Sequence, residues 1–140
     1  MRRERQTMPP TNHDEPKSYT LQIDGRLPGL NEYISTERSN KYKAAKMKRD
    51  SQMLVCAYIA KSLRGTHIRR RVRLDYLWVE RDRRRDPSNV AGFGVKVIED
   101  ALVTCGVLQD DGWDEIAGIT HAYAIDRRHP RIIVTITETE

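Results

Sequence analysis

Every second residue from Val72 to Trp78 is large and apolar, which predicts a strand with one buried face. After a charged stretch the chain reaches Pro87 and Ser88, a pair that suits the first turn of a helix. Gly106 is a suitable residue to end that helix. The residues between them recur at helical spacing as a buried stripe: Val90, Val97, Ile98, Ala101, Leu102 and Cys105. The fold must therefore accommodate a strand, a charged loop and an amphipathic helix in direct succession.

Other segments extend this unit to one domain. The patterns predict further strands at 18–26, 116–125 and 131–137, a long helix at about 39–63, and turns at 27–31 and 126–130. The order β-α-β-α-β-β predicts an α+β fold, a small mixed β-sheet of about four strands with two helices on one face. Residues 1 to about 17 hold almost no large apolar side chains, so we expect a disordered tail before a domain spanning 18–140.

The charge of the chain favours a polyanionic partner. Its formal net charge is +5, and 32% of its residues are charged. Arginine binds phosphate through two parallel hydrogen bonds, which makes clusters of arginine candidate DNA contacts. The clusters are Arg69, Arg70 and Arg71, and Arg83, Arg84 and Arg85. The predicted helix at 39–63 is also basic in its first half, either as a solvated face or as a DNA-facing flank. The alternative explanation of the net charge is ordinary solubility, against which the arginine clusters weigh.

The cysteine count and the apolar runs exclude other classes of protein. Cys56 and Cys105 both fall on apolar faces of predicted helices, so we expect buried free thiols in a reducing compartment rather than a disulfide framework. No apolar run is long enough to span a membrane, and the early arginines lack the apolar core of a signal peptide. We therefore expect a cytoplasmic protein.

Carboxylates flank the predicted helix that follows residue 86. Asp86 precedes it, while Asp110 and Asp111 come just after it. A straight helix of about sixteen residues would separate them by roughly 24 Å. Gly92 and Gly94 weaken a first turn, so the helix proper is predicted to begin near residue 95, which would shorten the gap. The alternatives are that Asp86 caps a helix and that the Asp110–Asp111 pair is an exposed turn.

Divalent cations such as Mg²⁺ prefer oxygen ligands, and two or three carboxylates suffice to hold one. A metal so held polarises a phosphodiester, and a nearby amine stabilises the charge that builds on phosphorus. Lys96 is the candidate amine, although Lys96 and Asp100 would also suit a plain surface ion pair.

The order of these elements resembles the RusA family of Holliday-junction resolvases. The resemblance rests on the run Arg84-Arg85-Asp86-Pro87-Ser88-Asn89, on Lys96 with Asp100-Ala101-Leu102, and on Gly106-Val107-Leu108 with Asp110-Asp111. The segment Leu27-Pro28-Gly29-Leu30-Asn31-Glu32-Tyr33 is similar to the loop before the first helix in phage-borne members. The similarity covers about residues 18–138.

The resemblance implies a homodimeric, Mg²⁺-dependent endonuclease that cuts four-way DNA junctions by paired nicks in recombination and repair, with Mn²⁺ as a substitute metal. It implies catalytic roles for Asp86, Asp111 and Lys96, and metal ligation by Asp86 and Asp111, to which Asp100 and Asp110 are added as candidates. Asn89 and the arginines of both clusters are the candidate DNA contacts.

Ser88 departs from the family pattern, which has a third metal-binding aspartate at that position. A hydroxyl is a weaker ligand than a carboxylate, so the site loses one negative charge. Either Asp100 or Asp110 replaces that charge, or the protein binds branched DNA and cuts it poorly. A third hypothesis is a protein-interaction module whose basic surface meets an acidic partner.

Overall fold

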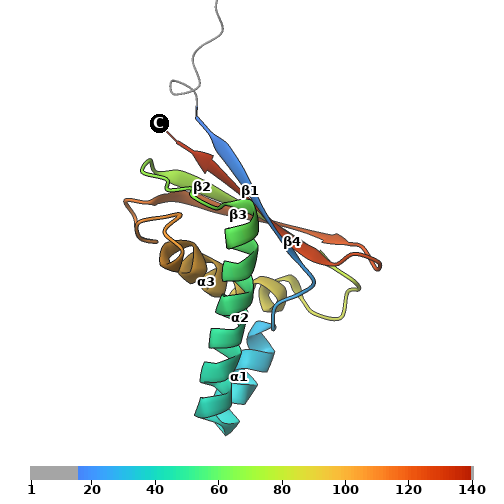
Figure 1. Ribbon diagram of the computed structural model, residues 1–140. Helices are drawn as coiled ribbons and strands as arrows, with labels where there is room; N and C mark the ends of the chain where they lie inside the picture. The colour runs from blue at the N-terminus through green and yellow to red at the C-terminus, as the bar shows by residue number, and fades with distance from the viewer. Residues whose placement is uncertain (1–15, 140) are drawn as a thin grey trace, which may run out of the picture.

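The computed structural model describes residues 16–139, which form a four-stranded sheet with three helices on one of its faces (Figure 1). The strands are β1 (Ser18–Asp24), β2 (Val72–Glu80), β3 (Ile116–Ile125) and β4 (Arg131–Glu138). The helices are α1 (Leu30–Ser39), α2 (Lys41–Ser62) and α3 (Pro87–Thr104). The predicted α+β class with a small mixed sheet is confirmed.

The strands lie in the order β1-β4-β2-β3. β4 is antiparallel to both β1 and β2, whereas β3 runs parallel to β2. Parallel neighbours need a crossover, and α3 supplies it between β2 and β3. This connection carries α3 along the sheet, with its first turn near the end of β3 and its last turns near the beginning.

The core lies between the sheet and helices α2 and α3. Strand positions that alternate toward the helices are buried, among them Leu74, Trp78 and Val134, and they pack against the apolar stripe of α3. Val90, Val97, Ile98, Ala101 and Leu102 of the predicted stripe are buried as expected, and Cys105 is half-buried. Gly106 has a φ of +77°, the left-handed conformation that a helix-ending glycine adopts.

The prediction of two helices is wrong, because residues 30–39 form a third. The sequence predicts a turn at 27–31 and a helix from about residue 39 with no element between them, yet α1 begins at Leu30, directly after Gly29. Its apolar residues Leu30, Tyr33 and Ile34 lie at helical spacing, but they span a single turn and none is fully buried, so the periodic signal from which a helix is recognised is short. Asn40 alone separates it from α2, and its side chain caps that helix by accepting from the N–H groups of Tyr42 and Lys43.

The expected late start of the helix after residue 86 is also wrong. Helix α3 runs without interruption from Pro87, and its two glycines serve close packing instead of a loop. A Cβ on Gly92 would lie 2.9 Å from Leu30 of α1, and one on Gly94 would lie 3.0 Å from the Trp78 ring. These glycines therefore let α1 and β2 approach α3 closely.

Three other expectations meet the structure in part. No helix among residues 16–139 is long and apolar enough to cross a membrane. Cys56 and Cys105 are free thiols, each half-buried. The predicted disordered tail, apart from its last two residues, lies outside the described residues.

Candidate active site

Lys96 lies between two carboxylates that approach it from different parts of the chain. Its Nζ is 3.3 Å from Asp100 Oδ1, one helical turn further along α3, and 3.2 Å from Asp111 Oδ2 in the following loop. The hydrogen bond with Asp111, followed by that with Asp100, raises the pKa of the Lys96 amine above its usual value. The structure therefore brings three of the predicted site residues together and keeps the amine protonated at neutral pH.

The loop that presents Asp111 is anchored on the core. Val107 and Leu108 are buried, and the N–H groups of both donate to the Leu102 carbonyl at the end of α3. Asp110 Oδ1 accepts from the Asp111 N–H at 2.8 Å, which turns the Asp110 carboxylate back onto its own loop. Asp110 therefore shapes the turn that aims Asp111 at Lys96.

Glu99 is a buried carboxylate beside this group. Its side chain shares a cleft of about 190 Å³ with Asp111, Trp113 and the first residues of β3. The Tyr76 hydroxyl donates to Glu99 Oε2 over 3.5 Å. A hydrogen bond this long is weak, so the Glu99 carboxylate is poorly satisfied. Burial, and then the charge of Asp111, raise the pKa of Glu99 above its usual value. A third carboxylate thus lies near Lys96.

Asp86 lies apart from this group. It occupies the N-cap position of α3 without a side-chain capping bond, and Lys96 follows ten residues later, about 15 Å along the helix axis. Asp86 instead lines a second cleft, of about 420 Å³, with Arg83, Arg85 and the end of β3. Within residues 16–139 no three His, Cys, Asp or Glu side chains are grouped closely enough to hold a metal ion. A single chain does not gather the four predicted metal ligands.

Two of the predicted ligands are placed where they could contribute to a Mg²⁺ site. An ammonium between two carboxylate oxygens marks a position of negative potential, and Mg²⁺ usually takes one or two carboxylates together with water and phosphate oxygens. Asp100 and Asp111 provide that pair, with Glu99 beside them. Asp110, whose carboxylate caps the loop, and the distant Asp86 are not members of this pair.

Arg85, predicted to contact DNA, has a structural role. Its Nε and Nη2 donate to the two carboxylate oxygens of Glu80 at 3.0 and 2.9 Å, and Nη1 donates to the Leu27 carbonyl. The side chains of Arg85 and Glu80 are only 17% and 8% exposed. All three nitrogens of this guanidinium are thus engaged inside the protein, and this arrangement gives no support to the prediction that Arg85 binds phosphate.

The other predicted DNA contacts divide between two ends of the molecule. Arg83 and Arg84 are exposed in the loop after β2, beside Asp86. Arg69, Arg70 and Arg71 are exposed before β2, about 30 Å away along a nine-residue strand. Arg71 Nε donates to the Trp113 carbonyl, which places this second cluster beside the loop of Asp111.

Asn89 is occupied in packing. Its Oδ1 accepts from the Asn31 N–H at 2.8 Å, in the first turn of α1. It thereby satisfies a helix N-terminus from outside that helix, in place of the side-chain bond that Gly29 cannot make. The predicted contact between Asn89 and DNA gains no support from this arrangement.

The sequence did not predict the roles of Glu99 and Glu80, or the contact between Trp78 of β2 and His121 of β3. Glu99 is the one charged residue that α3 buries, and a glutamate next to Ile98 and near Ala101 in an apolar stripe was the available signal. His121, on β3 between the two clefts, accepts from the Trp78 indole N–H at 2.9 Å, and burial lowers its pKa. The contact between His121 and Trp78 does not follow from local spacing, because the pairing of β2 with β3 creates it.

Replacement of Glu99 by glutamine tests its burial. A carboxyl whose pKa is raised in the folded state lowers stability as the pH climbs from the usual value of about 4.3 through the raised value. We expect Glu99→Gln to remove this decline and to unfold at no lower urea concentration than the wild type at pH 7. Urea midpoints between pH 4 and pH 8 measure it; an identical pH profile for both proteins would contradict the assignment.

The arrangement suits chemistry on a phosphodiester. It offers a protonated amine, two partly exposed carboxylates and arginines on flanking loops. Cations of this kind bind phosphate oxygens, and carboxylates bind a divalent cation or orient water. No family model and no curated protein matches the chain.

Proposed function

We propose that this chain is a Mg²⁺-dependent endodeoxyribonuclease that cuts four-way junctions and other branched DNA by paired nicks, on a RusA-like fold in the cytoplasm. The observation that carries the proposal is the meeting of Lys96 with Asp100 and Asp111. Lys96 and Asp100 are one helical turn apart, whereas Asp111 lies fifteen positions after Lys96, in a separate part of the resembling motif. The contact between Lys96 and Asp111 therefore depends on the fold of the loop after α3 and not on local helix spacing.

The residues of this site have separable roles. Lys96 keeps its proton, so it acts as a donor to a phosphate oxygen and not as a base. Asp100 and Asp111 hold its ammonium from two sides, which limits where that donor can point. Asp100 and Asp111 are also the residues that would hold Mg²⁺, which when bound activates water and neutralises charge on the phosphate. The exposed Arg83 and Arg84 would bind the DNA backbone.

The partner that completes the assembly is a second copy of this chain. Among the described residues β3 pairs only with β2, so its outer edge is open. This ten-residue strand contains no Lys, Arg, Asp or Glu in a chain that is 32% charged, and it exposes Ile119, Tyr123 and Ile125. Long, uncharged edge strands invite pairing with another chain. The proposed homodimer therefore forms through β3.

Antiparallel pairing of two β3 strands would have a consequence for the site. The Asp86 cleft lies against the end of β3, and the Asp111 cleft lies against its beginning. Because the second strand runs in the opposite direction, the Asp86 cleft of one protomer would come beside the Asp111 cleft of its partner. The carboxylates that one chain keeps apart would then meet across the two-fold axis.

The second candidate function is a branched-DNA-binding protein without cleavage. Ser88 favours it, since the first turn of α3 carries an exposed hydroxyl where the resembling family has a carboxylate. Such a protein would retain the arginine loops and the affinity for junctions. The two functions differ in one measurable respect, which is whether the wild type already cuts.

The test is Mg²⁺-dependent cleavage of a labelled four-way junction beside a linear duplex of matched sequence. We expect nicks at symmetric positions in the junction and little cutting of the duplex. If the wild type binds the junction but leaves it intact, Ser88→Asp should restore cutting, and the binder is the correct function. If the wild type neither binds nor cuts the junction, both the resolvase and the binder are rejected.

A further inference from the structure

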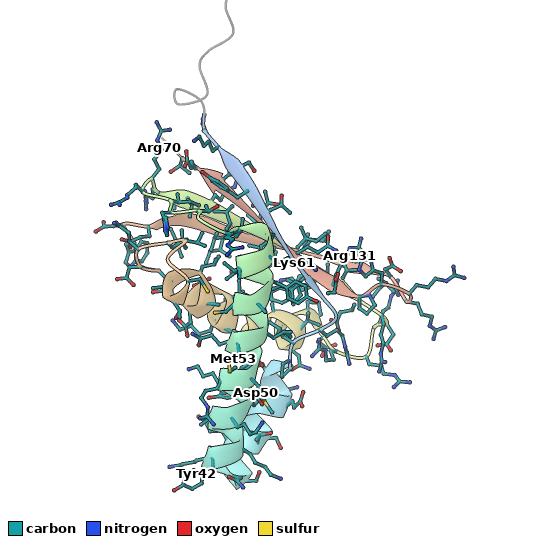
Figure 2. The ribbon with its side chains drawn as sticks, viewed as in Figure 1. Tyr42, Asp50, Met53, Lys61, Arg70 and Arg131 are labelled. Atoms are coloured by element: carbon teal, nitrogen blue, oxygen red, sulfur yellow. The ribbon has the colours of Figure 1, made fainter. Side chains whose placement is uncertain are left out.

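Helices α1 and α2 project from the sheet as a two-helix arm whose tip carries one exposed aromatic ring. Figure 2 shows Tyr42 at the end of the arm farthest from the sheet, on the opposite side of the molecule from Arg70. The Tyr42 side chain is 89% exposed. Gln52, which bonds Thr104 at the end of α3, lies ten residues further along α2, so the tip extends about 15 Å beyond that contact.

The tip is also the most strongly basic part of the arm. Residues 38–49 contain six Lys or Arg side chains and no Asp or Glu, and all six are exposed. They are Arg38, Lys41, Lys43, Lys46, Lys48 and Arg49. Only Lys46 has an ion-pair partner among the residues that the structure describes, and that partner is Asp50. The ring of Tyr42 is thus surrounded in sequence by cations.

The arm is firmly held at both of its ends. At the tip, the Asn40 side chain accepts from two N–H groups, and Ala44 is buried. At the root, the rings of Tyr33 and Phe93 lie 4.7 Å apart between α1 and α3. A presented ring on an ordered arm loses little conformational entropy when it contacts a ligand.

We propose that the α1–α2 arm is a second DNA-binding element, in which the lysines hold phosphates and Tyr42 stacks on an unpaired base at the branch point. This inference rests on the proposed function, because a branched substrate supplies the unstacked base. Basic grooves combined with an aromatic platform are how proteins bind single-stranded DNA, and any base can stack. The arm adds a contact remote from Lys96 and Asp111 and thereby selects branched over linear DNA.

Nucleic acid fits this surface better than an acidic protein does. Protein interfaces have an apolar centre in which aromatic residues sit among other apolar side chains. The neighbours of Tyr42 at the tip are lysine, asparagine and serine, and the next exposed large apolar residue on α2 is Met53, eleven positions away. A single ring among cations matches a base between phosphates.

Anisotropy of a fluorescein-labelled four-way junction and of a matched linear duplex, with Ca²⁺ replacing Mg²⁺, tests the arm. We expect Tyr42→Ala to raise the Kd for the junction about tenfold, which is near the lower end of the loss expected for one base stack. The Kd for the duplex should rise less than about twofold. Tyr42→Phe should keep wild-type affinity, because it keeps the ring. The combined change Lys41→Gln, Lys43→Gln and Lys48→Gln should weaken binding of both DNAs. It should also reduce the slope of log affinity against log salt concentration by about 0.9 per lysine.

Met53→Ala is the matched control, since Met53 is 70% exposed on the same helix but lies away from the tip. Equal losses on junction and duplex would overturn stacking by Tyr42, and unaltered affinity in both the Tyr42 and the lysine variants would overturn the DNA-binding arm. If the wild type shows no preference for junctions, the proposed function fails. The lysine variants then decide alone, through duplex affinity, whether the arm binds DNA.

Discussion

Asp111→Asn is expected to reduce Mg²⁺-dependent cleavage of a four-way junction by two to three orders of magnitude, the loss of a few kcal/mol of transition-state stabilisation. Asp111 both holds Lys96 at 3.2 Å and faces the cleft of Glu99. The amide keeps the shape of the side chain but removes the charge that holds the Lys96 ammonium and that the proposed Mg²⁺ would need. Junction affinity should change less than about threefold, because the exposed arginines proposed to bind phosphate are untouched.

Asp110→Asn is the matched control for this experiment. It makes the same charge change one residue away, and an asparagine Oδ1 can still accept from the Asp111 N–H. We expect this variant to cut within about threefold of the wild type, since the Asp110 carboxylate serves the turn. Single-turnover rates at saturating protein separate cleavage from binding. Normal cutting by Asp111→Asn, or equal loss in both variants, would contradict the assignment.

The sequence was sufficient for elements with strong periodicity. The alternation of residues 72–80 and the helical stripe after Pro87 correspond closely to β2 and α3. It was insufficient for α1, which buries none of its residues and is kept in place by contacts with other helices. Gly92 and Gly94 illustrate the same limit, because the partner that explains a helical glycine, here Leu30 or Trp78, lies far away in sequence.

The candidate site was predictable only as a set of residue types. The spacing of Lys96 and Asp100 predicted their contact, but the position of Asp111 depends on how buried Val107 and Leu108 anchor the loop. Arg84 and Arg85 are adjacent members of one basic run, so nothing in the local sequence distinguishes their roles. Tertiary structure separates them, since Glu80 at the end of β2 binds one and leaves the other exposed.

That separation gives the second large expected effect: Arg85→Ala should lower the free energy of unfolding by about 3 kcal/mol or more, the usual result of breaking a buried pair. The change leaves the Glu80 carboxylate, 8% exposed, with Arg26 at 3.4 Å as its remaining cationic partner. It also removes the donor to the Leu27 carbonyl. A loss of this size is a large part of the 5–15 kcal/mol typical of a domain, so urea unfolding at pH 7 would detect it readily.

Arg84→Ala is the control, because the Arg84 side chain is 84% exposed and its ion pair with Asp82 is long, with Nε 3.8 Å from Oδ2. We expect its unfolding free energy to change by less than about 0.5 kcal/mol. Adding Glu80→Gln to Arg85→Ala should recover part of the lost stability, since the unpaired charge is then gone. DNA binding should show the opposite order of effects. Only Arg84→Ala should make junction affinity depend less steeply on salt concentration. If Arg85→Ala were fully stable and also lost salt-dependent affinity, Arg85 would contact phosphate and its pairing with Glu80 would not hold the loop after β2.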